Sequence, residues 1–355
     1  MKELLIDKKE KNNLEIHNKR IEYLDIARGI AILLMILGHV INKGWKRDVI
    51  FSFHMPLFII ISGMFYKERD LKTFLVNIIK KLILPYLIVL LITNLIQSYF
   101  IENNKDIIQI LKNYLIQISY SYSYIKIKTD VKSIGVIWFF PFLAIIRTIF
   151  YTLKKVTKED DVLLFLMCIF ISYIGYILGQ KGIWLVFSID VALSSVIFYY
   201  IGYIINKNKI LDNILQNKKL LLIILLIWML GIKFGCIELA VRKYPGGLFS
   251  FITAICGTII VLKISMIIEQ KTKLMTKILA WFGKNSMYIL LIHRMEMSLV
   301  NYDKLFKVII NKKTLYKLLV SLTKIGIGTI GTLIIIYIKK SSTQIKKYIK
   351  NKCTT

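Results

Sequence analysis

Long apolar stretches recur along the whole chain, and each is about as long as a lipid bilayer is thick. A membrane-spanning helix needs about 20 mostly apolar residues. Ten stretches have this character: 24–42, 49–66, 82–101, 134–152, 161–179, 183–205, 218–233, 246–268, 278–299 and 316–338. Backbone polar groups in lipid find no water, so a spanning segment satisfies them internally as a helix. The sequence therefore predicts an all-α integral membrane protein with about ten transmembrane helices in one bundle.

The positions of the lysines predict how this bundle is oriented. Lysine-rich connections alternate with shorter or more mixed ones, and basic connections lie on the cytoplasmic side of membrane proteins. This pattern places both termini in the cytoplasm. We expect one membrane domain at 24–338, flanked by basic cytoplasmic tails at 1–23 and 339–355. The chain is therefore expected to cross its membrane several times.

Composition excludes several other classes of protein. The net charge of +29 comes from lysines in short stretches between apolar runs, where they meet anionic lipid, so we expect no nucleic-acid partner. The four cysteines, Cys168, Cys236, Cys256 and Cys353, show no paired spacing. Neither a metal site nor a disulfide framework is therefore expected. The N-terminal segment is too polar for a signal peptide, so we expect the first span to be uncleaved.

The first apolar stretch carries two ionisable residues, Arg28 and His39. Eleven helical steps bring them back to one face, about 16 Å apart at ~1.5 Å per residue. Ionisable side chains inside a membrane helix are costly and usually functional. Two structural interpretations stand beside this one: Arg28 as an anchor at the inner interface, and His39 as a histidine bonded to a backbone carbonyl. Asp25 lies in the polar entry to the same helix.

The second apolar stretch runs back inward and begins with His54, at about the depth of His39. Pro56 predicts a kink with unpaired backbone groups, which membrane proteins tolerate where the backbone is buried or lines a cavity. His54 suits either a functional role or packing at a helix end. Ser62 and the glycine after it suit either a functional site or close helix packing.

Other polar and aromatic residues also have two interpretations each. Lys80, Lys81 and Lys284 lie at the predicted inner interface, where they bind an anionic ligand or simply follow the positive-inside rule. Trp138 belongs either to an aromatic belt or to a surface that stacks on a sugar. His293 makes either a structural hydrogen bond or a functional contact.

Two further charges lie inside predicted spans. Arg147 lies in the fourth span and Asp190 in the sixth. Charges at membrane depth usually pair with one another. Arg147 and Asp190 are therefore candidates for an ion pair between helices, although their spacing does not decide the question.

Four motifs, taken in order, resemble a known family. They are YLDIARGIAILLMILGH, FSFHMPLFIIISGMFYK, WFFPFLAI and FGKNSMYILLIH. Together they resemble the acyltransferase-3 family of integral membrane acyltransferases, and within it the fucose 4-O-acetylase-like branch. The resemblance spans about residues 20 to 295. Members of that branch often carry lysine at the place of Arg28, so the sugar in the branch's name is not predicted for this chain.

The resemblance implies a ten-helix core that moves an acyl group, usually acetyl from acetyl-CoA, to carbohydrate hydroxyls of the cell envelope. Arg28 and His39 match the family's essential arginine and histidine, the histidine being the catalytic group. Asp25 matches the acidic residue before that arginine. The remaining matches are Pro56, Ser62, Gly63 and Trp138.

The chemistry of acyl transfer suits these residues. Attack of an alcohol on a thioester needs a base near neutral pH, and imidazole, with an unperturbed pKa of about 6.5, provides one. We expect His39 to be that base, with Arg28 and Asp25 as further catalytic residues. The side chains expected at the oxyanion or the acceptor are His54, Ser62, Trp138 and His293. The side chains expected at the CoA phosphates are Arg28, Lys80, Lys81 and Lys284. Direct transfer and a covalent acyl intermediate both stay open.

We therefore expect a membrane O-acyltransferase, specifically an O-acetyltransferase, that uses acetyl-CoA and no metal and modifies a cell-surface carbohydrate or its precursor. Its expected location is a bacterial-type cytoplasmic (cell) membrane. Its expected partners are acyl-CoA, the carbohydrate acceptor and the lipid bilayer. The alternatives are transfer to a non-carbohydrate acceptor, and a secondary transporter or flippase without chemistry; transporters commonly show internal repeats, which the sequence lacks. The acceptor sugar and position, the acyl chain length, the side of the membrane and the oligomeric state stay open. We expect segment 102–133 to select the acceptor.

Overall fold

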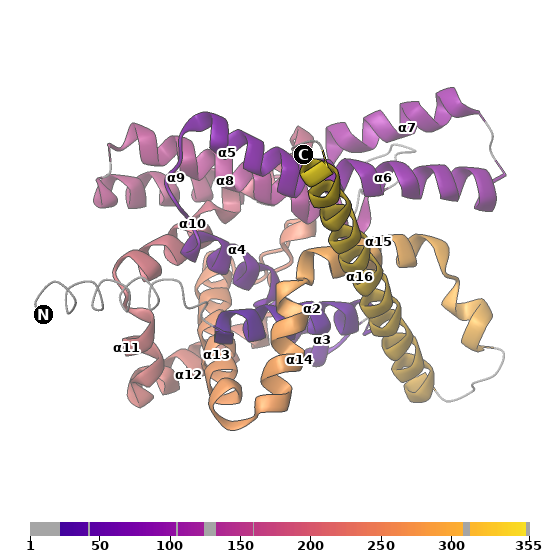
Figure 1. The fold of residues 1–355 in the computed structure, drawn as a ribbon. Helices are drawn as coiled ribbons and strands as arrows, with labels where there is room; N and C mark the ends of the chain where they lie inside the picture. The colour runs from indigo at the N-terminus through magenta and orange to yellow at the C-terminus, as the bar shows by residue number, and fades with distance from the viewer. Residues whose placement is uncertain are drawn as a thin grey trace, which may run out of the picture.

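The protein is helical throughout the part of the chain that the structure describes (Figure 1). This computed structural model describes residues 22–41, 43–103, 106–123, 133–158, 160–307 and 313–352. Within these ranges, extended pairing is limited to one isolated bridge between Glu238 and Lys243. The prediction of an all-α fold is confirmed.

The helices differ widely in length. The α-helices are α2 (Glu22–Val40), α3 (Trp45–Phe51), α4 (His54–Met64), α5 (Leu71–Ile78), α6 (Leu84–Ile96), α7 (Ile107–Tyr120), α8 (Phe139–Val156), α9 (Asp161–Gln180), α10 (Ile189–Lys207), α11 (Leu211–Gln216), α12 (Lys218–Phe234), α13 (Phe249–Lys271), α14 (Lys273–Lys284), α15 (Ser286–Leu299) and α16 (Lys313–Lys352). Short π-helical turns are η1 (Ile79–Ile83), η2 (Gln97–Ile101) and η6 (Asp303–Lys307). Short 3₁₀ turns are η3 (Gly135–Trp138), η4 (Val186–Ser188) and η5 (Leu239–Val241).

Eight helical segments in the described part are long and apolar enough to cross a membrane. They are Glu22–Val40, Trp45–Met64, Leu71–Ile101, Gly135–Val156, Asp161–Gln180, Val186–Lys207, Phe249–Lys271 and Thr314–Ser342. Each corresponds to one of the ten predicted spans. The predicted span 218–233 corresponds to α12, which is apolar but has only 17 residues. These helices confirm that the chain is an integral membrane bundle.

The remaining predicted span, 278–299, is divided between α14 and α15 at Asn285. The Asn285 side-chain amide donates a hydrogen bond to the carbonyl oxygen of Trp281 at 2.8 Å. Such local bonds compete with the helical backbone ladder. A single asparagine therefore coincides with the break in a stretch that is otherwise apolar enough for one helix.

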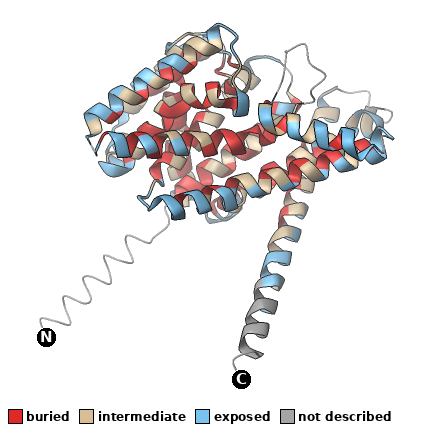
Figure 2. Ribbon diagram, turned by 90° about the horizontal axis from the view of Figure 1, so that it is seen from above, coloured by how far each residue is buried: buried red, intermediate tan, exposed pale blue. Residues whose placement is uncertain are grey.

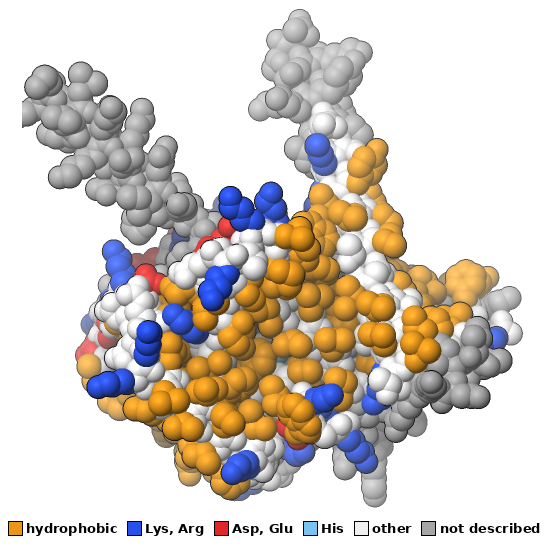
Figure 3. Space-filling view, turned by 90° about the horizontal axis from the view of Figure 1, so that it is seen from below, with side chains coloured by type: hydrophobic (Ala, Val, Ile, Leu, Met, Phe, Trp, Pro, Cys, Tyr) orange, Lys and Arg blue, Asp and Glu red, His pale blue; other side chains and the backbone are white. Residues whose placement is uncertain are grey.

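The outer surface of the bundle is apolar over a wide area. One face is covered by hydrophobic side chains, with lysines and arginines mostly toward its edges (Figure 3). Large apolar side chains are exposed along the peripheral helices, including Phe170 of α9, Met229 of α12 and Ile330 of α16. A contiguous apolar surface of this extent is unusual for a soluble monomer. Contact with lipid accounts for it.

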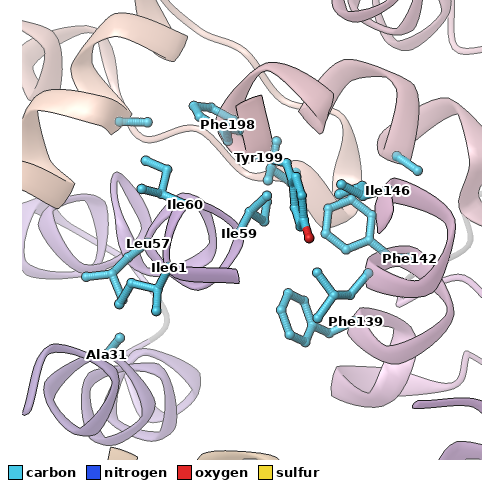
Figure 4. Packing of buried hydrophobic residues seen from close by; sticks show 14 of the residues in the cluster. Ala31, Leu57, Ile59, Ile60, Ile61, Phe139, Phe142, Ile146, Phe198 and Tyr199 are labelled. Atoms are coloured by element: carbon cyan, nitrogen blue, oxygen red, sulfur yellow. The ribbon is translucent and has the colours of Figure 1, made fainter. Parts of the chain in front are cut away.

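Buried residues gather in the central helices (Figure 2). The buried share is 67% in α2 and 72% in Gly135–Val156, but 22% in the peripheral α9. α4 joins its neighbours through two sets of side chains: Leu57 and Ile61 lie toward Ala31 of α2, whereas Ile59 lies toward Tyr199 of α10 (Figure 4). The core is therefore built around α2, α4, α8 and α10.

Glycines allow α2 and α14 to touch through their backbones. A Cβ atom at Gly29 would lie 2.0 Å from the carbonyl oxygen of Leu279, and one at Gly283 would lie 1.8 Å from that of Asp25. Both distances are far below a van der Waals contact. Small residues permit such close approach between membrane helices, so this pair sets the position of α2.

Close backbone contact at glycines also joins α4 to α10. A Cβ atom at Gly63 would lie 2.1 Å from the carbonyl oxygen of Tyr199, and one at Gly202 would lie 1.9 Å from that of Ile60. The obstacle is backbone in each case, which cannot rotate away. Of the two interpretations of the Ser62–Gly63 motif, the glycine therefore serves helix packing.

The hypothesis of an ion pair between Arg147 and Asp190 is wrong. Asp190 accepts a hydrogen bond from Nε of Arg242, and its second oxygen accepts one from the backbone N–H of Leu185 at 3.3 Å. Asp190 lies in the first turn of α10, beside the loop that carries Arg242, whereas Arg147 lies deeper, near the Tyr199 hydroxyl. The two charges are at different depths, so they do not meet.

We expect Gly202→Ala to destabilise the protein. The new methyl group would overlap the backbone of α4, and overpacking of this kind costs about 1–3 kcal/mol. Thermal unfolding of the detergent-solubilised protein measures the loss. Gly326→Ala is the matched control, because Gly326 also lies in a helix but has no heavy atom within 4 Å of the added position. Equal effects of the two substitutions would contradict the packing role.

Candidate active site

A cavity of about 390 Å³ lies among the central helices and the loop around η5. α2, α3, α4, η3, α8 and α15 all contribute to its wall. The polar or aromatic side chains at the wall include His39, His54, Trp138, Arg47 and Arg294. Pockets of this size hold a small ligand and are usually lined by apolar groups with a few placed polar ones. The composition of the wall fits that description.

His39 occupies the last turn of α2, and its side chain is exposed to the cavity. Its ring centroid lies 5.6 Å from that of His293 and 6.1 Å from that of Phe51. Within the described part of the chain, no hydrogen bond engages either nitrogen of His39. An imidazole without a structural bond is free to accept or donate a proton.

His293 belongs to a buried hydrogen-bonded chain. Its Nδ1–H donates to Oε2 of Glu296 at 2.8 Å, and the Lys324 ammonium donates to Oε1 of the same carboxylate at 2.6 Å. The three side chains are 1%, 1% and 8% exposed. A carboxylate on Nδ1 selects the tautomer in which Nε2 carries the lone pair, and Nε2 of His293 has no partner among the described residues. These hydrogen bonds thus leave Nε2 of His293 with its lone pair free, in a ring that lies next to His39.

His54 is held by the last residues of α3, the helix that precedes its own. Its Nδ1 lies 3.1 Å from the carbonyl oxygen of Ile50, to which Nδ1–H donates. Its ring packs edge-on against Phe51, with the centroids 4.7 Å apart. His54 is buried and lines the same cavity as His39. In the neutral form, this bond leaves Nε2 of His54 as an acceptor rather than a donor.

An ion pair that the sequence analysis missed lies at the wall of the cavity. Both Nη atoms of Arg47 donate to the carboxylate of Glu238, at 2.7 and 2.8 Å, and the guanidinium lies 4.0 Å from the centroid of Phe51. Arg47 is in α3, and Glu238 is 191 positions further along the chain. From the sequence, only one feature could have suggested this contact: the segments that carry Arg47 and Glu238 are both predicted to lie on the outer side of the membrane.

The other predicted site residues lie away from this cavity. Arg28 is near the opposite end of α2, with Nη2 3.4 Å from Oδ1 of Asp25 and its guanidinium 5.2 Å from the ring centroid of Phe65. Ser62 does not line the cavity. The three predicted lysines are all exposed: Lys80, Lys81 and Lys284.

The structure therefore brings four of the predicted residues together and leaves the rest apart. His39, His54 and Trp138 line the cavity, and His293 lies beside His39. The sequence analysis missed Lys324, which donates a hydrogen bond to the Glu296 carboxylate. A lysine inside the apolar stretch 316–338 is a signal of the same kind as His39. The catalytic and ligand-binding roles of these residues stay predictions.

These features define a multi-pass membrane protein whose helices enclose a cavity lined by imidazole and guanidinium groups. Comparison of the sequence with models of known protein families matches the acyltransferase domain of the acyltransferase-3 family over residues 21–339. The chain belongs to this family and is an acyl-transfer enzyme of the membrane. Comparison with curated proteins finds no match. The fucose 4-O-acetylase-like branch stays a prediction.

We expect Glu296→Gln to lower acyl-transfer turnover by about 10²-fold, within the range of general acid–base effects, because the amide no longer fixes the tautomer of His293. The substitution also leaves the Lys324 ammonium buried without its counter-ion, which destabilises the fold. The double variant Glu296→Gln/Lys324→Met removes both charges and separates the two effects. It should regain thermal stability without regaining turnover. Recovery of both stability and turnover would show that the hydrogen bonds joining His293, Glu296 and Lys324 are structural only.

Glu238 should make stability depend on pH. Burial raises the pKa of its carboxyl group, but the hydrogen bonds from Arg47 outweigh burial and hold the pKa below its ordinary value. A carboxylate of this kind stabilises the fold above its ordinary pKa, and that contribution is lost as the pH falls through the folded-state value. We expect Glu238→Gln to lower the free energy of unfolding by about 2 kcal/mol at pH 7. When the pH falls below about 4, the variant should lose less stability than the native protein, because it has no carboxylate left to protonate. Parallel profiles of unfolding midpoint against pH would contradict this.

Proposed function

We propose that the protein transfers an acetyl group from acetyl-CoA to a hydroxyl group of a cell-surface carbohydrate or of its precursor. The observation that carries the proposal is His39, an imidazole without a hydrogen bond in the described part of the chain, exposed inside a cavity among helices. Transfer from a thioester to an alcohol needs a base of this kind beside space for the reacting groups. Family membership supports the reaction class; the donor and the acceptor belong to the proposal.

His39 acts as the base in the proposed step. It removes the proton of the acceptor hydroxyl as the oxygen attacks the thioester carbonyl, which gives a tetrahedral oxyanion. Collapse of this intermediate breaks the carbon–sulfur bond and forms the ester. The departing thiolate takes the proton back from the imidazolium, so His39 ends the step in its starting form. His293, 5.6 Å away between ring centroids, supplies a second nitrogen that can share the proton.

The oxyanion needs hydrogen-bond donors that face it. His54 lines the cavity, but with Nδ1–H on Ile50 it donates to an oxyanion only when it is protonated. Trp138 also lines the cavity and offers an aromatic face to a sugar ring. We therefore assign Trp138 to the acceptor and backbone amides to the oxyanion, with His54 as a further donor only in its protonated form.

The donor is proposed to enter from the other end of α2. Arg28 and His39 lie on one face of this helix, about 16 Å apart by helical rise, a separation that suits the long arm between the thioester and the phosphates of CoA. The guanidinium of Arg28, with the exposed Lys80, Lys81 and Lys284, suits those phosphates. By the distribution of lysines, this end faces the cytoplasm of a bacterial-type cell membrane and the cavity faces outward.

We expect His39→Ala to lower turnover by about 10²–10⁴-fold while the protein stays folded. Arg28→Ala should act mainly on the donor and raise KM for acetyl-CoA by about tenfold or more, the cost of a lost charged hydrogen bond. Both effects are measured as CoA release by purified protein in nanodiscs, with and without a pool of glycan acceptors. His17→Ala is the control, because this histidine lies outside the residues matched by the family.

Each part of the proposal has its own contradicting result. Equal CoA release by native protein and His39→Ala would exclude His39 as the base. If native protein neither binds nor cleaves any of several acyl-CoAs, the assignment of acetyl-CoA as the acyl donor is contradicted. Labelled acetyl groups found only on amines or lipid headgroups would remove the carbohydrate acceptor and leave the rest standing.

A further inference from the structure

Arg294 is a cation at the cavity wall with no acidic partner among the described residues. It follows His293 in α15 and lines the cavity that also holds His39. Its Nη1 donates to Oγ of Ser298 at 2.5 Å, and its Nη2 donates to the backbone oxygen of Ser133 at 3.4 Å. Its buried Nε has no partner among the described residues. No carboxylate in the described part of the chain forms an ion pair with Arg294.

The rest of the cavity wall does not neutralise this charge. Glu238 is the acidic residue at the described wall, and both of its oxygens already accept hydrogen bonds from Arg47. The pair of Arg47 and Glu238 is neutral, so Arg294 leaves the described part of the cavity wall with an excess positive charge. Keeping an uncompensated charge inside a membrane protein is costly. An anionic ligand bound in the cavity would supply the missing counter-ion.

The local backbone is built to admit the guanidinium. Gly135 has a φ of +61°, and a Cβ atom there would lie 3.2 Å from Cδ and 3.5 Å from Nε of Arg294. A side chain at this position would therefore crowd the arginine. The free Nε and the weakly bonded Nη2 share one edge of the guanidinium, the edge that holds a carboxylate or a phosphate through two parallel hydrogen bonds.

We propose that Arg294 binds an anionic group of the acceptor, a carboxylate or a phosphate, so that the enzyme modifies an acidic carbohydrate. This inference rests on the proposed function, since it takes the acceptor to be a sugar that reaches His39. A neutral sugar would leave the arginine desolvated and unpaired. Loss of one charged hydrogen-bonded contact costs about 1.5–3 kcal/mol, or roughly tenfold to a hundredfold in affinity.

The anion belongs to the acceptor rather than to the donor. Arg294 and His39 line one cavity of about 390 Å³, and the thioester must reach His39. The phosphates of CoA are separated from the thioester by the whole pantetheine arm, and the cations proposed for them lie at the other end of α2. An anion inside this cavity is therefore carried by the other substrate.

Binding of three small sugars to the full-length protein in nanodiscs tests the proposal. The probes are D-glucuronate, D-glucose 6-phosphate and D-glucose, which share a ring and differ in charge. We expect at least one anionic sugar to bind about tenfold or more tightly than glucose. Arg294→Gln should abolish the difference, whereas Arg294→Lys, which keeps the charge, should retain part of it. Lys46→Gln, which removes an exposed cation outside the cavity, should leave the preference unchanged.

The affinity for CoA is measured on the same variants and separates the sources of the anion. Native protein and Arg294→Gln should bind CoA equally, within about twofold. Weaker CoA binding by Arg294→Gln would assign the arginine to the donor and overturn the proposal, as would equal binding of all three sugars or no binding of either anionic one. Absence of CoA binding by native protein would instead contradict the proposed function. Thermal unfolding should show Arg294→Gln at least as stable as native protein; a marked loss would show that the guanidinium is structural.

Discussion

Contact between helix backbones is the constraint on which the site depends. In lipid, apolar side chains gain little by leaving their solvent for one another, so close packing and interhelical bonds hold a bundle together. The paired glycines bring α2 against α14 and α4 against α10 at distances that no larger residue allows. Because α2 ends beside His39 and α4 begins with His54, the same contacts determine where both imidazoles reach the cavity.

Charged side chains at and near the cavity differ in whether the protein supplies their counter-ion. Asp190 is bonded to Arg242, and Glu296 is bonded to Lys324, so these charges have counter-ions within the protein. Arg294 has only neutral oxygens as partners in the described part of the chain. A buried pair is costly to break but adds little to stability as a whole, so the two ion pairs maintain geometry. Arg294 has no ion pair among the described residues, and it lies at the cavity wall, where an anionic ligand would reach it.

Sequence patterns predicted the spans well and the polar contacts poorly. Apolar length is a local property, and eight predicted spans correspond to helices that satisfy it. The break at Asn285 coincides with a side-chain bond back to Trp281, which a hydropathy average over the stretch does not reveal. The partner of Asp190 is Arg242, 52 positions away in a loop rather than in a span. Depth in the bilayer alone was not enough to pair charges correctly.

The amino-acid sequence was sufficient to identify this chain as an all-α membrane protein of the acyltransferase-3 family and to single out His39. Both conclusions follow from local features: apolar runs of bilayer length, ordered motifs, and an ionisable group where a helix is otherwise apolar. The tertiary structure was needed to show that His39 lies beside His293, that Lys324 reaches Glu296, and that Arg294 lines the cavity with no carboxylate partner among the described residues. His293 and Glu296 lie three positions apart in α15, whereas the contacts of His39 with His293 and of Glu296 with Lys324 join different helices. Their distances depend on where the helices cross and how closely they pack, which no pattern along a single helix specifies.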